Sequence, residues 1–299
     1  MTGFSADWLA LREPFDREAR ANTAPGLGLH ALGDRLRRGR ARIEVLDLAC
    51  GTGANLRALA PELRGDQRWV AVDHDAQLLA QLPVSMARWA MDCGFDFRGG
   101  GGAEPASIGG PGWHVEFETL QLDLVQSPDM LPLAGVDLVT AAALLDLVSA
   151  NWLDDLLARV AASRPALLFA LSVDGRLHWE PALEGDAEVA RLFAAHQQRD
   201  KGFGPALGGA APHWAAARLD TPGLELHAAD SDWRIDGGDG PAAQAMLAAM
   251  VDGIASAAIE QDPAALSRVL EWKLQRLDAL ARSLLVVGHR DLLAIPLTS

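Results

Sequence analysis

The residues best suited to bind a nucleotide-like cofactor form a short run around position 50. The apolar stretch 45–48 leads into the turn Cys50-Gly51-Thr52-Gly53, which opens a helix. A second apolar stretch, 69–72, follows and ends at Asp73, where a carboxylate can accept hydrogen bonds from both hydroxyls of a ribose. The two halves, in this order, predict a strand–turn–helix unit that holds a nucleotide-like group.

The same run indicates which cofactor the turn suits. A dinucleotide-binding turn has a third glycine for close packing, and Leu56 stands at that position. Asp47, at the mouth of the turn, would repel a pyrophosphate but suits an ammonium or a sulfonium group. S-adenosylmethionine carries both cations. The residues therefore favour S-adenosylmethionine over a dinucleotide, with S-adenosylhomocysteine as the product.

This part of the chain resembles the class I S-adenosylmethionine-dependent methyltransferases. Their first motif runs acid, any, glycine, any, glycine, any, glycine; Asp47, Gly51 and Gly53 match it, and Ala49 replaces the first glycine. Because alanine does not adopt positive φ freely, we expect an ordinary backbone conformation at Ala49. Cys50 is interpreted as a small packing residue of the turn.

The resemblance implies a cofactor site drawn from several segments. Asp123 would hydrogen-bond the adenine amino group, His74 would lie beside the adenosine, and the loop after 136–142 would face the methyl group. Arg12 is the residue of the N-terminal segment favoured to reach a ligand. The full expected set is Arg12, Asp47, Ala49, Cys50, Gly51, Gly53, Asn55, Asp73, His74, Asp123, Leu124 and Ala141.

The expected fold is α/β, a Rossmann-like doubly wound sheet of seven strands with added helical cap elements. The inner strands are continuous apolar runs, as when helices cover both faces of a parallel sheet. The resemblance implies that the last strand is antiparallel. After the two strands already described, the expected strands are 114–124, 136–146, 166–173, 224–235 and 284–295.

Beyond this sheet we expect an N-terminal lid, residues 1–42, and a methyltransferase domain, 43–299. Insertions are expected at about 94–114, 176–222 and 236–282. The alternative for the N-terminal segment is a surface helix with a local ion pair between Asp16 and Arg20.

Two of the insertions have a readable local pattern. The glycine- and proline-rich stretch 94–112 predicts a mobile connection. In the helical segment 263–282, apolar residues recur at three- and four-residue spacing and predict one buried stripe. That stripe consists of Leu266, Val269, Leu270, Leu274, Leu277 and Leu280.

Composition excludes several classes of function. The net charge of −14 argues against a nucleic-acid partner, since such binding needs clustered cations, and the basic run 35–42 is interpreted as a solvated helix end. There is no run of 18 apolar residues and the N-terminus lacks a signal-peptide pattern, so we expect no membrane span and a cytoplasmic protein. Two cysteines are too few for a disulfide framework or a zinc site, and no metal is expected. A monomer or a homodimer is expected.

Four residues are candidates for chemistry on the methyl acceptor: Asp146, His196, Asp200 and Lys201. Asp146 follows the fourth strand on the methyl-facing side; its alternative role is to cap the next helix, which Ser149 can already do. His196 and Asp200 would share one face of a helix, and Lys201 suits an acidic or carbonyl-bearing group. The alternative for His196 is a half-buried packing role. Arg12 and Asp146 would close the other side of this pocket.

The expected activity is methyl transfer to a small-molecule acceptor, with a hydroxyl, an amine and a carbon all left open. The run Ala141-Ala142-Ala143 lacks the side chains that hold the amino group of a nucleic-acid base. Aminopropyl transfer is an alternative, although it would need paired acids and Asp146 stands alone. The other alternative is a non-catalytic or accessory S-adenosylmethionine-binding protein. Segments near both ends and around 196–208 also resemble a group of bacterial methyltransferases.

Overall fold

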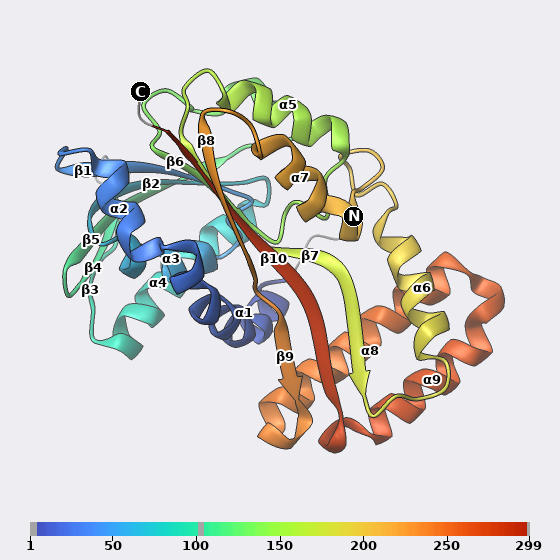
Figure 1. Ribbon diagram of the computed structural model, residues 1–299. Coiled ribbons are helices and arrows are strands. Elements are labelled where there is room, and N and C mark those ends of the chain that lie inside the picture. Colours follow the sequence, from blue (N-terminus) through green and yellow to red (C-terminus); the bar gives the residue numbers. More distant parts are fainter. Residues whose placement is uncertain (1–4, 101–104, 298–299) are drawn as a thin grey trace.

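The computed structural model describes residues 5–100 and 105–297, which form a sheet lobe and a smaller cap lobe (Figure 1). A ten-stranded sheet runs through both lobes, in the order β3-β4-β5-β2-β1-β6-β7-β10-β8, with β9 paired to β10. The strands are β1 Arg42–Leu48, β2 Gly65–Asp73, β3 Asp96–Arg98, β4 Ala106–Gly110, β5 Trp113–Gln121, β6 Leu138–Ala142, β7 Ala166–Glu180, β8 Leu224–Asp230, β9 Trp233–Asp236 and β10 Leu284–Pro296.

The centre of the sheet confirms the expected fold class. Strands β5, β2, β1, β6 and β7 are parallel neighbours, and β10 is antiparallel to β7 and to β8. Two features add strands to the expected seven. The stretch 94–112, expected to be a mobile connection, contains the edge strands β3 and β4, and 224–235 divides into β8 and β9. The division falls at Ser231 and Asp232, whose side chains bond to Asp291 and to the His289 amide.

Helices cover both faces of the sheet. One apolar cluster joins α2, α3 and α4 to the strands, and another joins α5 and α7 to the opposite face. Both faces are therefore buried, which accounts for the continuous apolar strands. The helices are α1 Ala6–Leu27, α2 Leu29–Arg37, α3 Ala54–Leu63, α4 Ala76–Cys93, α5 Ala150–Val160, α6 Asp186–Gln197, α7 Ala211–Leu219, α8 Pro241–Gln261 and α9 Leu266–Asp278; 3-10 turns lie at 128–130, 208–210, 237–239, 263–265 and 280–282.

The cap lobe consists of the C-terminal half of β7, α6, β9, α8, α9 and the N-terminal half of β10 (Figure 1). The pairing of β10 with β7 shifts register between Val287 and His289. A Cβ at Gly288 would lie 2.2 Å from Asp174 Oδ1, so the crossing of the two strands requires glycine there. Among the described helices, α8 alone is long and apolar enough to span a membrane, a test that buried core helices also pass.

The predicted buried stripe in 263–282 is correct for Val269, Leu277 and Leu280, which pack in the cap-lobe core, and wrong for the other three leucines. Leu266, Leu270 and Leu274 are exposed, and the helix buries the face that carries Val269, Trp272 and Arg276. The reason lies in the partner surface: Trp272 packs edge-on against the Trp179 ring, and Arg276 is ion-paired to Asp186. The bulky and charged groups of the cap lobe therefore decide which face of α9 is buried.

Helix α1 carries four buried polar residues, Arg12, Asp16, Arg20 and Thr23. The expected Asp16–Arg20 ion pair is wrong. Asp16 accepts two hydrogen bonds from Arg12, at 2.9 and 3.0 Å, and a third from Trp233 Nε1 at 2.9 Å. Arg20 points instead to the glycine turn. The polar face of α1 thus lies against the sheet lobe and β9, and the helix is not a freely solvated surface element.

Candidate cofactor and acceptor site

The glycine turn is held against the end of β2 by its backbone. The Cys50 amide donates to Val72 O, and the Gly53 amide donates to Cys50 O, both at 2.9 Å. Gly51 and Gly53 have φ of 54° and 84°. The cysteine is buried, as expected for a packing residue.

The expectation of an ordinary backbone at Ala49 is wrong, since its φ is 52°. Ala143 and Leu171 share this φ, and all three residues border the same cavity. A non-glycine residue in this region is strained unless its surroundings hold it. Here the hydrogen bonds at the ends of the parallel strands hold the backbone. Strain is thus concentrated where the sheet meets the cavity.

Asp73 is fixed at the end of β2 by three neighbours. Its Oδ2 accepts the Gly51 amide at 2.9 Å, and its Oδ1 accepts the Asp75 amide at 3.0 Å and lies 3.2 Å from His74 Nδ1. An ionised carboxylate has about four acceptor positions, so positions remain for hydroxyl donors. The predicted pair of features is therefore joined by a direct bond between the glycine turn and the carboxylate.

Asp47 is fully buried and only half satisfied. Asn55 Nδ2 donates to its Oδ1 at 2.6 Å, whereas its Oδ2 has no hydrogen-bond partner in the described part of the chain. Burial raises the pKa of Asp47 to about 7, against the opposing effects of the Asn55 hydrogen bond and the Arg20 charge. A buried carboxylate oxygen without a hydrogen-bond partner favours a cationic donor. Such a donor would offset the free-energy cost of removing the oxygen from water.

Four residues that the sequence interpretation missed complete this network. Arg20 Nη1 donates to Asn55 Oδ1 at 2.7 Å, and Asn55 also donates to Thr140 Oγ1. Glu13 forms two bonds with Arg57, at 2.6 and 2.7 Å, and Arg57 donates to the Thr52 carbonyl. The four-residue spacing of Arg12, Asp16 and Arg20 was a signal that one helix face was polar for a reason.

A cavity of about 100 Å³ lies between α1 and the glycine turn. It is lined by Arg12, Ala49, Cys50, Gly51 and Asn55 of the expected set. Arg20, Ala142, Ala143 and Leu171 lie there too. Arg12 and Arg20 of α1 therefore face the glycine turn across a small space, while Asp47 does not line the cavity itself. Among the described residues no group of three or more potential ligands is arranged to hold a metal.

The remaining expected cofactor residues are not part of the lining of this cavity. The Leu122 amide donates to Asp73 O at 2.9 Å, which places the segment after β5 beside the end of β2. Asp123 is exposed and accepts the Val125 amide at 2.8 Å, so its carboxylate also shapes its own turn. Leu124 is buried, and its carbonyl accepts from Trp152 Nε1. Ala141 is buried within β6.

Asp146 follows β6 and is half-buried. Its Oδ1 is buried with no partner among residues 5–100 and 105–297. Burial raises the pKa of Asp146 to about 6, while the charges of Arg12 and Lys201 oppose the rise. Ser149 Oγ accepts the Trp152 amide and caps α5, so the alternative in which Asp146 caps that helix is wrong. Its carboxylate remains available for chemistry.

The inserted segment 196–208 is attached to the loop that carries Asp146. The Leu207 and Gly208 amides donate to Val148 O and Asp146 O at 2.8 and 3.0 Å. Lys201 is half-buried; burial lowers its pKa, against the effects of Glu260 and Asp146. Arg12 and Lys201, which come from distant parts of the sequence, thus both lower the pKa of Asp146 by their charge.

Two other candidates, His196 and Asp200, already make contacts within the protein. His196 Nε2 lies 3.2 Å from Glu260 of α8, which also binds Arg199. Helix α6 ends at Gln197, so the prediction that His196 and Asp200 share a helical face is wrong. Asp200 Oδ1 accepts the amides of Gly202 and Gly204 at 2.7 and 3.0 Å and shapes the loop. A chain reversal at 198–200 separates the two side chains.

The sequence matches no family model and no curated protein. Solved structures with a similar arrangement include a cyclopropane-fatty-acyl-phospholipid synthase-like protein from Lactobacillus casei, with 15% identity over 97% of this chain and 94% of that one, and a TM-score of 0.46. An S-adenosylmethionine-dependent methyltransferase from Geobacter sulfurreducens has 14% identity over 90% of each chain and a TM-score of 0.41. The plantazolicin methyltransferase has 11% identity over 97% and 91%, with a TM-score of 0.40. At these identities the similarity says nothing about individual site residues.

Proposed function

We propose that this protein is an S-adenosylmethionine-dependent methyltransferase that acts on a small-molecule acceptor. One observation carries the proposal: the buried, unpartnered Oδ2 of Asp47 lies beside a glycine turn whose Gly51 amide is bonded to Asp73. A carboxylate that lacks a cation and a carboxylate poised for a ribose, on neighbouring parallel strands, are the two features that this cofactor needs.

The residues present fit the cofactor. Asp73 would hold the ribose hydroxyls, and Asp47 with Asn55 would hold the ammonium side. Arg20, which already lines the cavity, would hold the carboxylate of the methionine part. When bound, S-adenosylmethionine supplies a methyl group activated by its sulfonium. The protein then has to align an acceptor and exclude water.

The proposed chemistry on the methyl acceptor depends on Asp146. With a pKa of about 6, its carboxylate is mostly ionised at neutral pH and can accept a proton from a hydroxyl, an amine or an acidic carbon. The positive charges of Arg12 and Lys201 both favour the ionised form of this carboxylate. We infer that these cations hold an acidic or carbonyl-bearing part of the acceptor while Asp146 receives the proton.

Calorimetry tests the cofactor assignment directly. We expect S-adenosylmethionine and S-adenosylhomocysteine to bind with 1:1 stoichiometry, and NAD to show no binding under the same conditions. Leu56 and the acid at 47 are the reasons for this selectivity. Binding of NAD without S-adenosylmethionine would end the proposal.

A labelling experiment tests turnover. The wild-type protein is incubated with methyl-labelled S-adenosylmethionine and a small-molecule extract, and labelled products are resolved by mass spectrometry. We expect Asp146→Asn and Lys201→Ala to reduce the labelling about 100-fold or more, as loss of a general base or an aligning charge does, with cofactor affinity retained. Asp155→Asn, an exposed residue of α5, is the matched control.

His196→Ala belongs to the same experiment. A role in the acceptor pocket predicts the same loss of labelling, whereas a packing role through Glu260 predicts a change in stability alone. If the wild-type protein binds the cofactor and transfers no label, the non-catalytic alternative replaces the proposal.

A further inference from the structure

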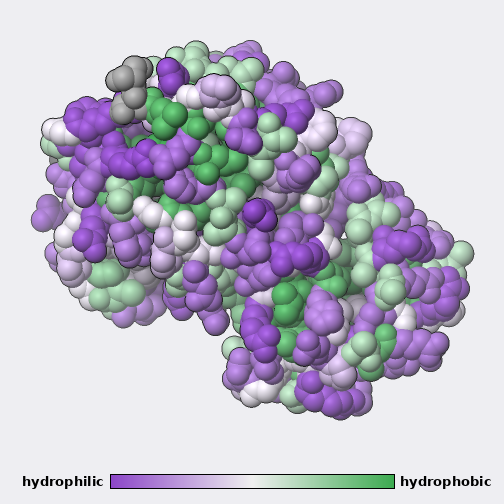
Figure 2. Space-filling view, viewed as in Figure 1, coloured by the Kyte–Doolittle hydropathy of each residue, from purple (hydrophilic) through white to green (hydrophobic). Residues whose placement is uncertain are grey.

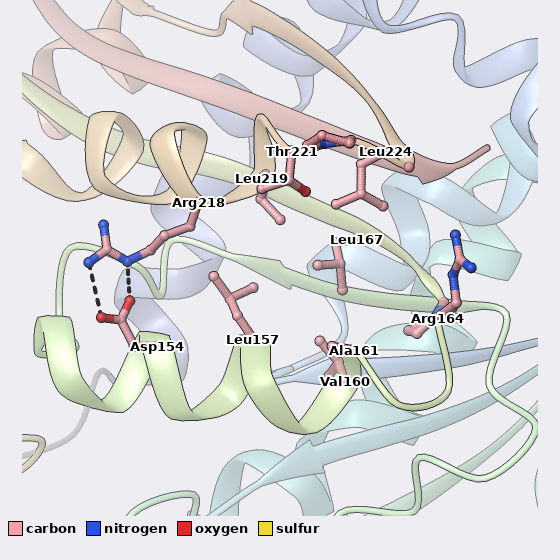
Figure 3. A pocket seen from close by; sticks show the side chains of 13 residues that line it. Asp154, Leu157, Val160, Ala161, Arg164, Leu167, Arg218, Leu219, Thr221 and Leu224 are labelled. Carbon is pink, nitrogen blue, oxygen red and sulfur yellow. Dashed lines mark hydrogen bonds and ion pairs between the residues drawn. The ribbon is translucent and has the colours of Figure 1, made fainter.

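A second cavity lies at the opposite end of the parallel strands from the glycine turn. This α5–α7 pocket has a volume of about 580 Å³ and lies between α5, α7 and the first residues of β7 and β8 (Figure 3). Its lining includes Leu167 and Leu224, at the beginnings of those strands, whereas the glycine turn follows the end of a strand. The two cavities therefore share no lining residue.

The walls of the α5–α7 pocket are apolar. Val160, Leu167 and Leu219 are buried and form its floor, and Leu157 and Leu224 are half-buried at its sides (Figure 3). Pockets of a few hundred cubic ångströms with apolar walls and a few polar groups bind small molecules in many proteins. The walls favour an unbranched apolar chain over a polar ligand.

Charge is placed at the two ends of the pocket. At one end Asp154 and Arg218 form an ion pair, with Arg218 Nη2 to Asp154 Oδ2 at 3.0 Å. Arg218 also lies 3.7 Å above the Trp214 ring, and Trp214 Nε1 donates to Asp154. This end is neutralised by its own contacts. The only carboxylate of the lining is therefore already used.

Arg164 stands at the other end. Its guanidinium makes no ion pair or side-chain hydrogen bond with any residue that the structure describes, and a Cβ at Gly223 would lie 3.5 Å from its Nη2. Gly223 thus lies next to the guanidinium of Arg164, which is exposed at the rim of the pocket. Since the Asp154–Arg218 pair cancels, Arg164 gives the lining a net charge of +1.

We propose that the α5–α7 pocket binds a single-chain amphiphile with an anionic headgroup, its chain along the leucine floor and its headgroup at Arg164. The length of the pocket suits a single-chain ligand. The ten residues from Asp154 to Arg164 are mostly helical and span on the order of 15 Å. The site is separate from the proposed methyl-transfer site, so its occupant is a second ligand of the protein.

Titration calorimetry with three ten-carbon probes, each kept monomeric, tests the proposal. Decanoate is expected to bind at one site, at least tenfold more tightly than decanol, and decyltrimethylammonium is expected not to bind. Decyl phosphate, as a second anion, distinguishes a preference for a carboxylate from a preference for a phosphate headgroup. Either anion binding in this way supports the site.

Two variants locate the site. Arg164→Glu should weaken decanoate binding at least tenfold and leave decanol binding unchanged, and Leu157→Trp should weaken both by filling the pocket. Arg159→Ala is the control. Arg159 lies on α5, as Leu157 does, but it pairs with Asp129 outside the pocket. Circular dichroism establishes that each variant is folded.

The proposal is overturned if decanoate shows no saturable binding, if decanol binds as tightly as decanoate, or if Arg164→Glu binds decanoate like the wild type. Competition between decanoate and S-adenosylhomocysteine would also overturn it, because that result places the amphiphile in the cavity at the glycine turn. The outcome is independent of whether methyl transfer is observed.

Discussion

The sheet lobe and the cap lobe bury their apolar residues in different ways. In the sheet lobe, β1, β2 and β6 have helices on both faces, so most residues of these strands are buried whichever face they point to. In the cap lobe, α9 has an exposed leucine ridge beside a buried face that holds a tryptophan and an arginine. The pattern of apolar residues thus predicts burial well for a strand that is covered on both faces. It predicts burial poorly for a helix such as α9, of which only one face packs against the core.

The cap lobe also depends on charge in a way that the centre of the sheet does not. Arg276 has a fully buried side chain, which donates to Asp186 and, at 3.0 Å, to Pro181 O, and its guanidinium lies 4.5 Å from the Trp179 ring centre. Asp186 in turn accepts Trp272 Nε1 at 2.8 Å and the Leu183 amide at 2.7 Å. One carboxylate joins α6, α9 and the loop after β7.

The largest effect should therefore come from Asp186→Ala. Removing this carboxylate leaves the buried Arg276 charge unpaired, which costs about 3–5 kcal/mol. Urea unfolding followed by tryptophan fluorescence measures the loss. Glu188→Ala, which removes the exposed pair with Arg268, is the control and should cost far less, since solvent screens this pair. Equal losses in the two variants would mean that the cap lobe has no special dependence on a buried charge.

In the sheet lobe, the largest effect should be on binding. Asp73→Ala should weaken the binding of S-adenosylmethionine by roughly 2–4 kcal/mol, because two hydroxyls lose a charged acceptor in a buried position. Asp73→Asn should lose less. Asp66→Asn, at the opposite end of β2, is the control. Calorimetry gives the affinities, and an unchanged affinity in the alanine variant would place the ribose elsewhere.

The pH dependence of stability should report the buried state of Asp146. Its pKa of about 6 lies above the usual value of about 3.9 for the unfolded chain. The folded protein therefore binds the proton more tightly, so this group stabilises the fold below pH 4 and the contribution is lost as the pH rises to 6. We expect the free energy of unfolding of the wild type, relative to Asp146→Asn, to fall by about 1–3 kcal/mol over that range. A flat difference would show that the carboxylate is solvated.

The smallest effect is expected on the leucine ridge of α9. Leu274→Gln should change stability by about 0.5 kcal/mol or less, since this side chain is 68% exposed. Val269→Ala, on the buried face of the same helix, should cost about 1–3 kcal/mol. Thermal and urea unfolding of the pair would sharpen the comparison of the lobes. A larger loss from Leu274→Gln would indicate that the ridge is covered in solution.

The strands of the sheet lobe were predictable because burial on both faces leaves a direct signature in the sequence. The turn at Gly51 and Gly53 was also predictable, and so was the carboxylate at Asp73, because local spacing sets both. Ala49 was misread, since its positive φ is imposed by the strand ends around it. Asp200 was misread because the end of α6 at Gln197 is not marked by a proline or a glycine.

The amino-acid sequence by itself determined the central parallel strands, the glycine turn and the pair of acids at Asp47 and Asp73. These follow from local periodicity and turn chemistry, which act between residues near in the chain. Only the tertiary structure decided that Arg20 reaches Asn55, that the charges of Arg12 and Lys201 lower the pKa of Asp146, and that Arg164 stands beside an apolar pocket. Such contacts depend on how distant elements pack, and burial then sets the charge state of each group.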